Sequence, residues 1–230
     1  MIPIRKTVTR ESLRRASKPA SMLGFLPRDE KWIREHPVIK MSNTVLGKGC
    51  VGEVHNIIGT KRLVVKVTRD YSTAKNKAFA VRELKKESSD YNKWKLNERP
   101  VFIPTKIIHF DKRLGLIRPV VHVIAVYGHR ASGTPSNLDK MIVKHKELIT
   151  DAMLHKLHDN LVKLSEEGFV FQDGLQLGVD AANRILVYDS GFLIRDKKGS
   201  LRAYETNNHY WKEFIRAFPN GIKVFGEIKK

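Results

Sequence analysis

The stretch LGKGCVGEV, residues 46–54, places three glycines and a lysine between apolar residues. Glycines at this spacing let backbone N–H groups approach phosphate oxygens, which a Cβ would obstruct. The spacing alone is weak evidence, because glycine-rich turns occur in several folds. The residues of this stretch that could contact a nucleotide are Gly47, Lys48, Gly49, Cys50, Gly52 and Val54.

Downstream side chains could complete a site that handles phosphate. Lys66 lies in VVKV, a β-branched run that would hold its ammonium at a sheet surface. The next predicted helix offers a carboxylate to pair with it, Glu83 or, one turn later on nearly the same face, Glu87. We favour Glu83, because Glu87 lies closer to the polar stretch SSDYNK. Two further acids, Asp173 in FVFQDGLQ and Asp189 in LVYDSG, bracket a predicted hairpin.

The surrounding pattern predicts the elements that position these residues. Ser72 and Thr73 can cap a helix that runs to about Trp94. A second helix is predicted over 144–167, with leucines at helical spacing and a glycine as its stop. Strands are predicted over 44–49, 51–58, 61–69, 103–111 and 113–121, and two short ones flank the turn 180–183.

With these residues in this order, the chain resembles the protein-kinase-like superfamily. LGKGCVGEV resembles its Gly-rich loop, VVKV its third-strand lysine motif, and VREL the helix that carries the paired glutamate. FQDGLQLGVD resembles a shortened catalytic loop, and DSG resembles the metal-binding D-F-G element. The resemblance covers about residues 42–192.

The resemblance implies an α+β class and a bilobal fold. The N-lobe would hold a five-stranded antiparallel sheet and one helix, and the C-lobe would be reduced and mainly helical. We place the N-lobe at 41–121 and the C-lobe at 122–230, after a basic, flexible N-terminal extension over 1–40.

The chain departs from the family pattern around its acids. Gln176 stands where the metal-binding asparagine is usual, with Asp173 three residues upstream rather than five. Phe171-Gln172 replaces the usual His-Arg, no A-P-E follows, and only 41 residues remain after Asp189. This pattern is similar to the minimal atypical kinases among bacterial secreted (type III) effectors.

The family's chemistry, carried onto these positions, implies an ATP- and Mg²⁺-dependent protein kinase acting on Ser or Thr hydroxyls, with host proteins among its candidate substrates. Lys66, held by Glu83, would grip the α- and β-phosphates. Asp189, assisted by Gln176, would bind Mg²⁺. Asp173 would orient, or accept the proton of, the attacking hydroxyl.

Composition bounds the partners. Lys and Arg number 43 against 24 Asp and Glu, and a net charge of +19 favours an acidic partner. Nucleic acid has no support beyond this charge, since aromatics are 8% and no reading motif occurs. The apolar runs are too short to span a membrane, and the N-terminus does not resemble a signal peptide. One cysteine forbids an intrachain disulfide and fits a reducing compartment. Without a signal peptide, we expect the producer's cytoplasm or delivery into a host cell.

Three other functions stay open at this stage. A pseudokinase scaffold could use the basic surface for binding alone. A small-molecule phosphotransferase would need an acidic pocket for a cationic substrate, which a +19 chain hosts poorly. Transfer of a nucleotide instead of a phosphoryl group is the third. Ser17 in LRRASKP is either an autophosphorylation site or part of a disordered arm.

Overall fold

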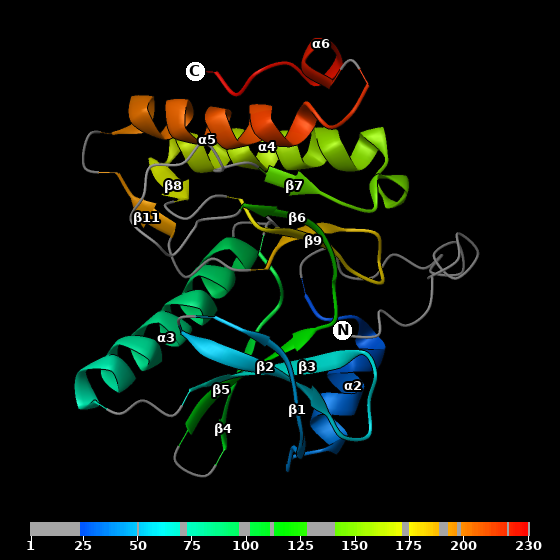
Figure 1. The fold of residues 1–230 in the computed structure, drawn as a ribbon, viewed down its shortest axis with the longest axis vertical. Coiled ribbons are helices and arrows are strands. Elements are labelled where there is room, and N and C mark those ends of the chain that lie inside the picture. Colours follow the sequence, from blue (N-terminus) through cyan, green and yellow to red (C-terminus); the bar gives the residue numbers. More distant parts are fainter. Residues whose placement is uncertain are drawn as a thin grey trace.

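The chain folds into two lobes, a β-sheet lobe with one long helix and a mainly helical lobe (Figure 1). The mixed α+β architecture and the five-stranded antiparallel sheet predicted from the sequence are therefore confirmed. The computed structural model describes residues 24–49, 51–69, 73–96, 102–110, 113–127, 141–171, 175–188, 193–196, 199–219 and 221–229. Within this part of the chain, no helix combines the length and apolarity needed to cross a bilayer.

The N-lobe sheet has the strand order β1-β2-β3-β5-β4, with every neighbouring pair antiparallel. Consecutive strands are joined by short turns except between β3 and β4, where the long helix α3 is inserted. The strands are β1 (Met41–Lys48), β2 (Gly52–Ile57), β3 (Leu63–Thr68), β4 (Lys106–Phe110) and β5 (Arg113–Pro119).

The side chains of β3 point alternately to the two faces of the sheet, and each face has its own hydrophobic core. Leu63, Val65 and Val67 face one side of the sheet and pack against the N-terminal helix α2 (Pro27–Glu35). Residues at the intervening positions face α3, because successive side chains of a strand point to opposite faces. Lys66 is one of these, so it lies on the α3 side of the sheet.

The segment before β1 belongs to the N-lobe. In α2, Ile33 is buried together with Phe25 against the sheet, and Trp32 packs at the edge of the same cluster. The expectation of a flexible extension as far as residue 40 is therefore wrong for residues 24–40. The apolar side chains of α2 cover a sheet face that would otherwise be exposed. Ser17 lies outside the described residues.

The helix α3 (Ala74–Leu96) crosses the other face of the sheet (Figure 1). Thr73 begins it as expected, since its hydroxyl accepts a hydrogen bond from the Asn76 N–H at 3.3 Å. Ala80 and Leu84 of α3 pack on Leu114 and Leu116 of β5 in a second buried cluster. The helix thus presents one buried stripe to the strand that carries Lys66 and to its neighbour.

The C-lobe contains two small sheets under helices. A four-stranded sheet has the order β10-β9-β6-β7, and β11 pairs with β8. The β9–β10 hairpin confirms the predicted strand pair, with Asp180 at its turn. The strands are β6 (His122–Tyr127), β7 (Met141–Val143), β8 (Phe169–Phe171), β9 (Leu177–Val179), β10 (Ile185–Val187) and β11 (Leu193–Arg195).

Two long helices, α4 (Asp151–Glu166) and α5 (Ser200–Ile215), complete the C-lobe, followed by the short α6 (Gly221–Phe225). The predicted helix over 144–167 starts later, because Lys146–Leu148 form a 3-10 turn and the Thr150 hydroxyl caps the α-helix at the Met153 N–H. Buried Asn207 of α5 donates to the Ser165 hydroxyl at 2.9 Å and to the Phe169 carbonyl at 2.8 Å. These bonds join α5 to α4 and β8.

Backbone contacts fix one lobe on the other. Phe102, which follows α3, pairs in a parallel bridge with Val187 at the end of β10. The Ile103 N–H donates to the Val187 carbonyl at 2.9 Å. Lys86 of α3 also donates to the carbonyl of Leu193. The helix that faces Lys66 is therefore tied to the two C-lobe strands that flank Asp189 in the sequence.

Candidate active site

Lys66 lies at the centre of a cross-strand row. Gly47 pairs with Val54, Val54 pairs with Lys66, and Lys66 pairs with Leu116 in the registers of four adjacent strands. Residues directly opposite each other in an antiparallel sheet share a face. The ammonium of Lys66 is therefore flanked by apolar side chains and lies one strand away from the glycine turn.

The carboxylate that pairs with Lys66 is Glu87, at 2.8 Å between Nζ and Oε1. The Lys66 side chain is 8% exposed and that of Glu87 is fully buried. The preference for Glu83 is thus corrected: its carboxylate contacts the neighbouring Arg82 at 3.3 Å. A carboxylate and an ammonium buried together keep their charges only when they are paired, so each holds the other in place.

The buried face of α3 explains why Glu87, and not Glu83, pairs with Lys66. Leu84, Glu87, Ser88 and Tyr91 recur at the i, i+3, i+4, i+7 spacing of one helix face, and all four are buried. The polar stretch that argued against Glu87 therefore continues the buried face of the helix. The same spacing, extended through the polar residues, could have identified Glu87 from the sequence.

Arg118 is a site residue that the sequence analysis missed. It lies on β5, on the same side of the strand as Leu114 and Leu116, and is buried. One of its nitrogens, Nη2, donates to Oε2 of Glu87, whereas Lys66 donates to Oε1. The signal was available: an arginine at an inward-facing position of a buried strand requires an anionic partner.

The other end of the Arg118 guanidinium reaches the C-lobe. Its Nη1 donates to the backbone carbonyl of Tyr188 at 2.9 Å. Tyr188 directly precedes Asp189 in the sequence. One planar guanidinium therefore connects the Lys66–Glu87 pair to the backbone next to Asp189, a two-ended contact that a lysine could not reproduce.

These three side chains carry a net charge of +1. Lys66 and Arg118 share the single carboxylate of Glu87. In addition, Nε of Arg118 is buried without a hydrogen-bond partner among the described residues. A spare donor in a buried setting favours an anion, and the phosphates of a nucleotide are anions of this kind.

The three glycines of the turn have two different roles. A Cβ on Gly52 would stand 2.4 Å from the backbone oxygen of Val67, so β3 itself requires a glycine there. A Cβ on Gly47 would meet nothing within 4 Å, and one on Gly49 only the Gly52 oxygen at 3.8 Å. Gly52 is thus needed for packing, whereas the missing side chains of Gly47 and Gly49 leave open space beside the turn.

The remaining candidates of the glycine stretch differ in position. Lys48 is exposed and pairs with Glu53, its cross-strand partner, at 3.5 Å. Val54 is half-buried on the Lys66 face and can offer an apolar contact there. Cys50 lies outside the described residues.

The two predicted acids, Asp173 and Asp189, also lie outside the described residues. Gln176, the predicted metal-binding amide, is half-buried directly before β9. Its backbone carbonyl accepts the N–H of Tyr188 at 3.1 Å, which places it beside the residue that precedes Asp189. No group of three His, Cys, Asp or Glu side chains that could hold a metal occurs within the described ranges.

No protein-family model matches the sequence, and no curated protein matches it either. Among solved structures, the chain is similar to the kinase domain of Mycobacterium tuberculosis PknI in a double-mutant form. That similarity has 17% sequence identity, covers 76% of this chain and 74% of that chain, and gives a TM-score of 0.40.

Proposed function

We propose that the chain binds ATP with Mg²⁺ and transfers the γ-phosphoryl group to a Ser or Thr hydroxyl of a protein. The observation that carries this proposal is the buried Lys66–Glu87 pair, set one strand from a glycine turn. Because the Lys66 side chain is buried, its charge does not contribute to solubility as a surface lysine would. Its place on the sheet suits contact with an anion held under the turn.

The described residues fit the phosphates of a nucleotide. The space beside Gly47 and Gly49 is open, and the Lys66–Glu87–Arg118 cluster includes a buried donor, Nε of Arg118, without a hydrogen-bond partner among the described residues. Val54, half-buried on the same face as Lys66, offers apolar surface of the kind that a nucleobase beside the phosphates requires. For Mg²⁺, Gln176 supplies an amide oxygen, and Asp189 would supply the carboxylate that such a hard cation needs.

Phosphoryl transfer depends mainly on positioning and on neutralising charge. Lys66 would bind the α- and β-phosphate oxygens, while Glu87 and Arg118 keep its ammonium in place. Bound Mg²⁺ would neutralise charge on the phosphates during transfer. The acceptor hydroxyl oxygen forms the new bond to the γ-phosphorus, the bond to the ADP oxygen breaks, and Asp173 accepts the hydroxyl proton.

The acceptor in this proposal is a protein with an acidic surface. With a net charge of +19, the chain attracts polyanionic surfaces and repels cationic small molecules. Such long-range attraction raises the rate of encounter and weakens with added salt. Phosphorylation of an acidic test protein should therefore slow at high ionic strength more than that of a neutral one.

Separate measurements of binding and transfer test the proposal. We expect Lys66→Met to weaken ATP binding, measured by calorimetry, and to abolish transfer. Asp173→Ala should bind ATP as the wild type does and transfer no phosphate. Lys85→Met, which removes an exposed charge from α3, is the matched control and should change neither. Near-normal transfer by Asp173→Ala would refute the assigned roles.

A further inference from the structure

A charged cavity lies between the lobes, away from the Lys66 face of the sheet. Its volume is about 150 Å³. The start of α2, the turn before β3, the β5–β6 connection at Val120 and the turn after β9 form its walls. Since α2 covers the sheet face opposite to Lys66, this cavity is separate from the candidate active site.

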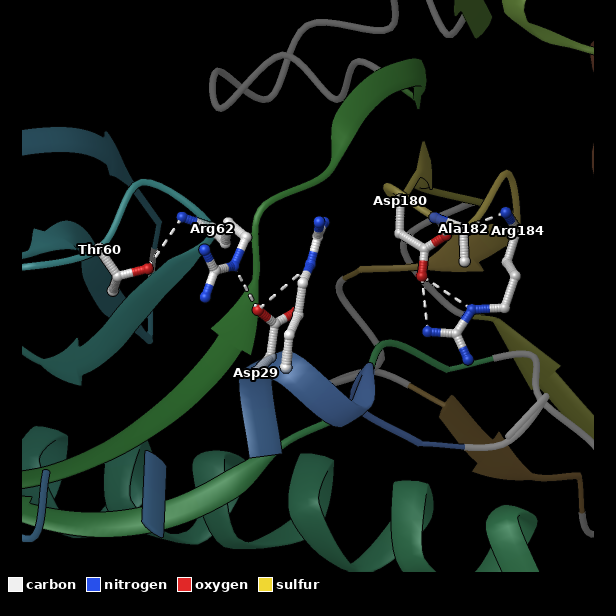
Figure 2. A network of polar contacts seen from close by, with 7 residues as sticks. Asp29, Thr60, Arg62, Asp180, Ala182 and Arg184 are labelled. Atoms are coloured by element: carbon white, nitrogen blue, oxygen red, sulfur yellow. Dashed lines mark hydrogen bonds and ion pairs between the residues drawn. The ribbon is translucent and has the colours of Figure 1, made fainter. Parts of the chain in front are cut away.

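Positive side chains outnumber negative ones around the cavity, four to two with His122 counted as neutral. Three of the cations come from the N-lobe, and the fourth comes from the β9–β10 turn of the C-lobe. Figure 2 shows much of this network from close by. The charged residues are Arg28, Lys61, Arg62, Arg184, Asp29 and Asp180.

The two carboxylates are already neutralised. Asp29 is buried, and its Oδ1 accepts a hydrogen bond from Nε of Arg62 at 2.7 Å (Figure 2). Asp180 is also buried, and its Oδ2 accepts from Nε of Arg184 at 2.7 Å. Its Oδ1 accepts the N–H groups of Ala182 and Arg184 at 2.9 and 3.0 Å. Paired in this way, neither acid opposes an incoming anion strongly.

The other two cations keep donors available. The Arg28 side chain is 55% exposed, and its one ion-pair contact among the described residues is the 4.0 Å approach of Nε to Asp29. Lys61 is exposed and has no ion pair within the described part of the chain. Both line the cavity and can turn towards a ligand without breaking a close contact.

The start of α2 adds a backbone donor. Leu26 occupies the N-cap position without a side-chain cap, and Pro27 has no N–H. The Asp29 and Glu30 N–H groups bond to the Leu26 carbonyl. The Arg28 N–H has no hydrogen-bond partner among the described residues, and an unpaired N–H at a helix start attracts anions.

We propose that this cavity binds a phosphate-type dianion, either free phosphate or the phosphate of a small monoester. The side chains of Arg28 and Lys61 and the Arg28 N–H supply the donors. The Asp29–Arg62 and Asp180–Arg184 ion pairs stabilise the segments that line the cavity. On the same measure one water molecule needs only about 10–15 Å³, so the cavity has room for an anion several times larger than water. The ligand contacts both lobes and restrains their relative motion.

Titration of the ¹⁵N-labelled protein with inorganic phosphate, followed by NMR, tests this site residue by residue. We expect saturable shifts of the Arg28, Lys61 and Ala181 amide signals. A parallel titration with O-phosphoserine distinguishes the two sources: tighter binding than inorganic phosphate indicates a monoester site, and weaker binding indicates a site for the free anion. Shifts confined to the glycine turn, or no saturable shift, would overturn the proposal.

A pair of double variants separates a built site from general attraction to a basic protein. Arg28→Gln/Lys61→Gln should weaken phosphate binding about tenfold or more, because it removes two charge-assisted donors. Lys31→Gln/Arg34→Gln removes the same charge from exposed positions elsewhere on α2 and should change the affinity less than about twofold. Equal losses in the two variants would overturn the proposal, and so would no loss in the first. The test does not involve Lys66, so its outcome is independent of the proposed kinase activity.

Discussion

The replacement Glu87→Gln tests the most specific feature of the site. It keeps the shape of the side chain but removes the one negative charge between Lys66 and Arg118. All three side chains are buried, so water cannot compensate for the loss. Removing one partner of a buried ion pair costs about 3–5 kcal/mol.

For a chain of this size, 1 kcal/mol corresponds to about 2–4 °C in Tm. We therefore expect Glu87→Gln to lower Tm by about 6–20 °C in a thermal melt followed by circular dichroism. The matched control is Glu83→Gln, one helical turn earlier. Glu83 is itself buried, but its partner Arg82 is mostly exposed, so we expect a smaller loss than for Glu87→Gln.

A double variant extends this test to Arg118. In Glu87→Gln/Arg118→Met, one of the two cations that pair with Glu87 is also removed. The double variant should therefore be more stable than the sum of the two single losses predicts, by about 1 kcal/mol or more. Strict additivity, or a larger loss for Glu83→Gln than for Glu87→Gln, would refute the assignment of Glu87 as the shared partner.

Three further predictions concern the surrounding fold. Gly52→Ala should lower the free energy of unfolding in urea by about 1–3 kcal/mol, because its Cβ would overlap the β3 backbone. Gly47→Ala should lower it by less than about 0.5 kcal/mol, and equal losses would contradict the two roles. The pKa of His122 lies below 6.5, chiefly because of burial and secondarily because of His145. The unfolded chain therefore binds the proton more readily, and the unfolding free energy should fall as pH drops below about 6.5, less steeply in His122→Gln; an unchanged slope in that variant would argue against this. Asn207→Leu should cost about 1–3 kcal/mol in the same assay, since it breaks two buried hydrogen bonds, and a neutral result would show that they contribute little.

Local patterns in the sequence predicted most of the secondary-structure elements of the N-lobe. β-Branched runs, a glycine turn and the Thr73 cap predicted β1 to β3 and the start of α3 with small errors at their ends. The choice between Glu83 and Glu87 could not be settled this way, because residues four apart point in similar directions on a helix. Packing of Leu84 against the sheet fixes the rotation of α3, and that contact joins parts of the chain that are distant in sequence.

The C-lobe was harder to predict. Helix α5 was missed because its sequence, SLRAYETNNHYWKEFI, mixes polar residues with aromatic ones that only tertiary packing buries, such as Trp211 and Phe214. The position of Arg118 follows from three segments that meet only in the folded chain: β5, α3 and the end of β10. Alternation along β5 predicts that it faces inward, but not which groups it contacts there.

Transfer of label from γ-labelled ATP in the presence of Mg²⁺ tests the central claim most directly. The wild type, Asp173→Ala and Asp189→Ala would each be incubated with acidic acceptor proteins, and the products separated by gel electrophoresis. We expect labelled Ser or Thr with the wild type alone, and no label from α-labelled ATP. Label from the α-position would instead indicate nucleotide transfer. Absence of label from both nucleotides, despite measurable ATP binding, would contradict a kinase and favour a binding protein.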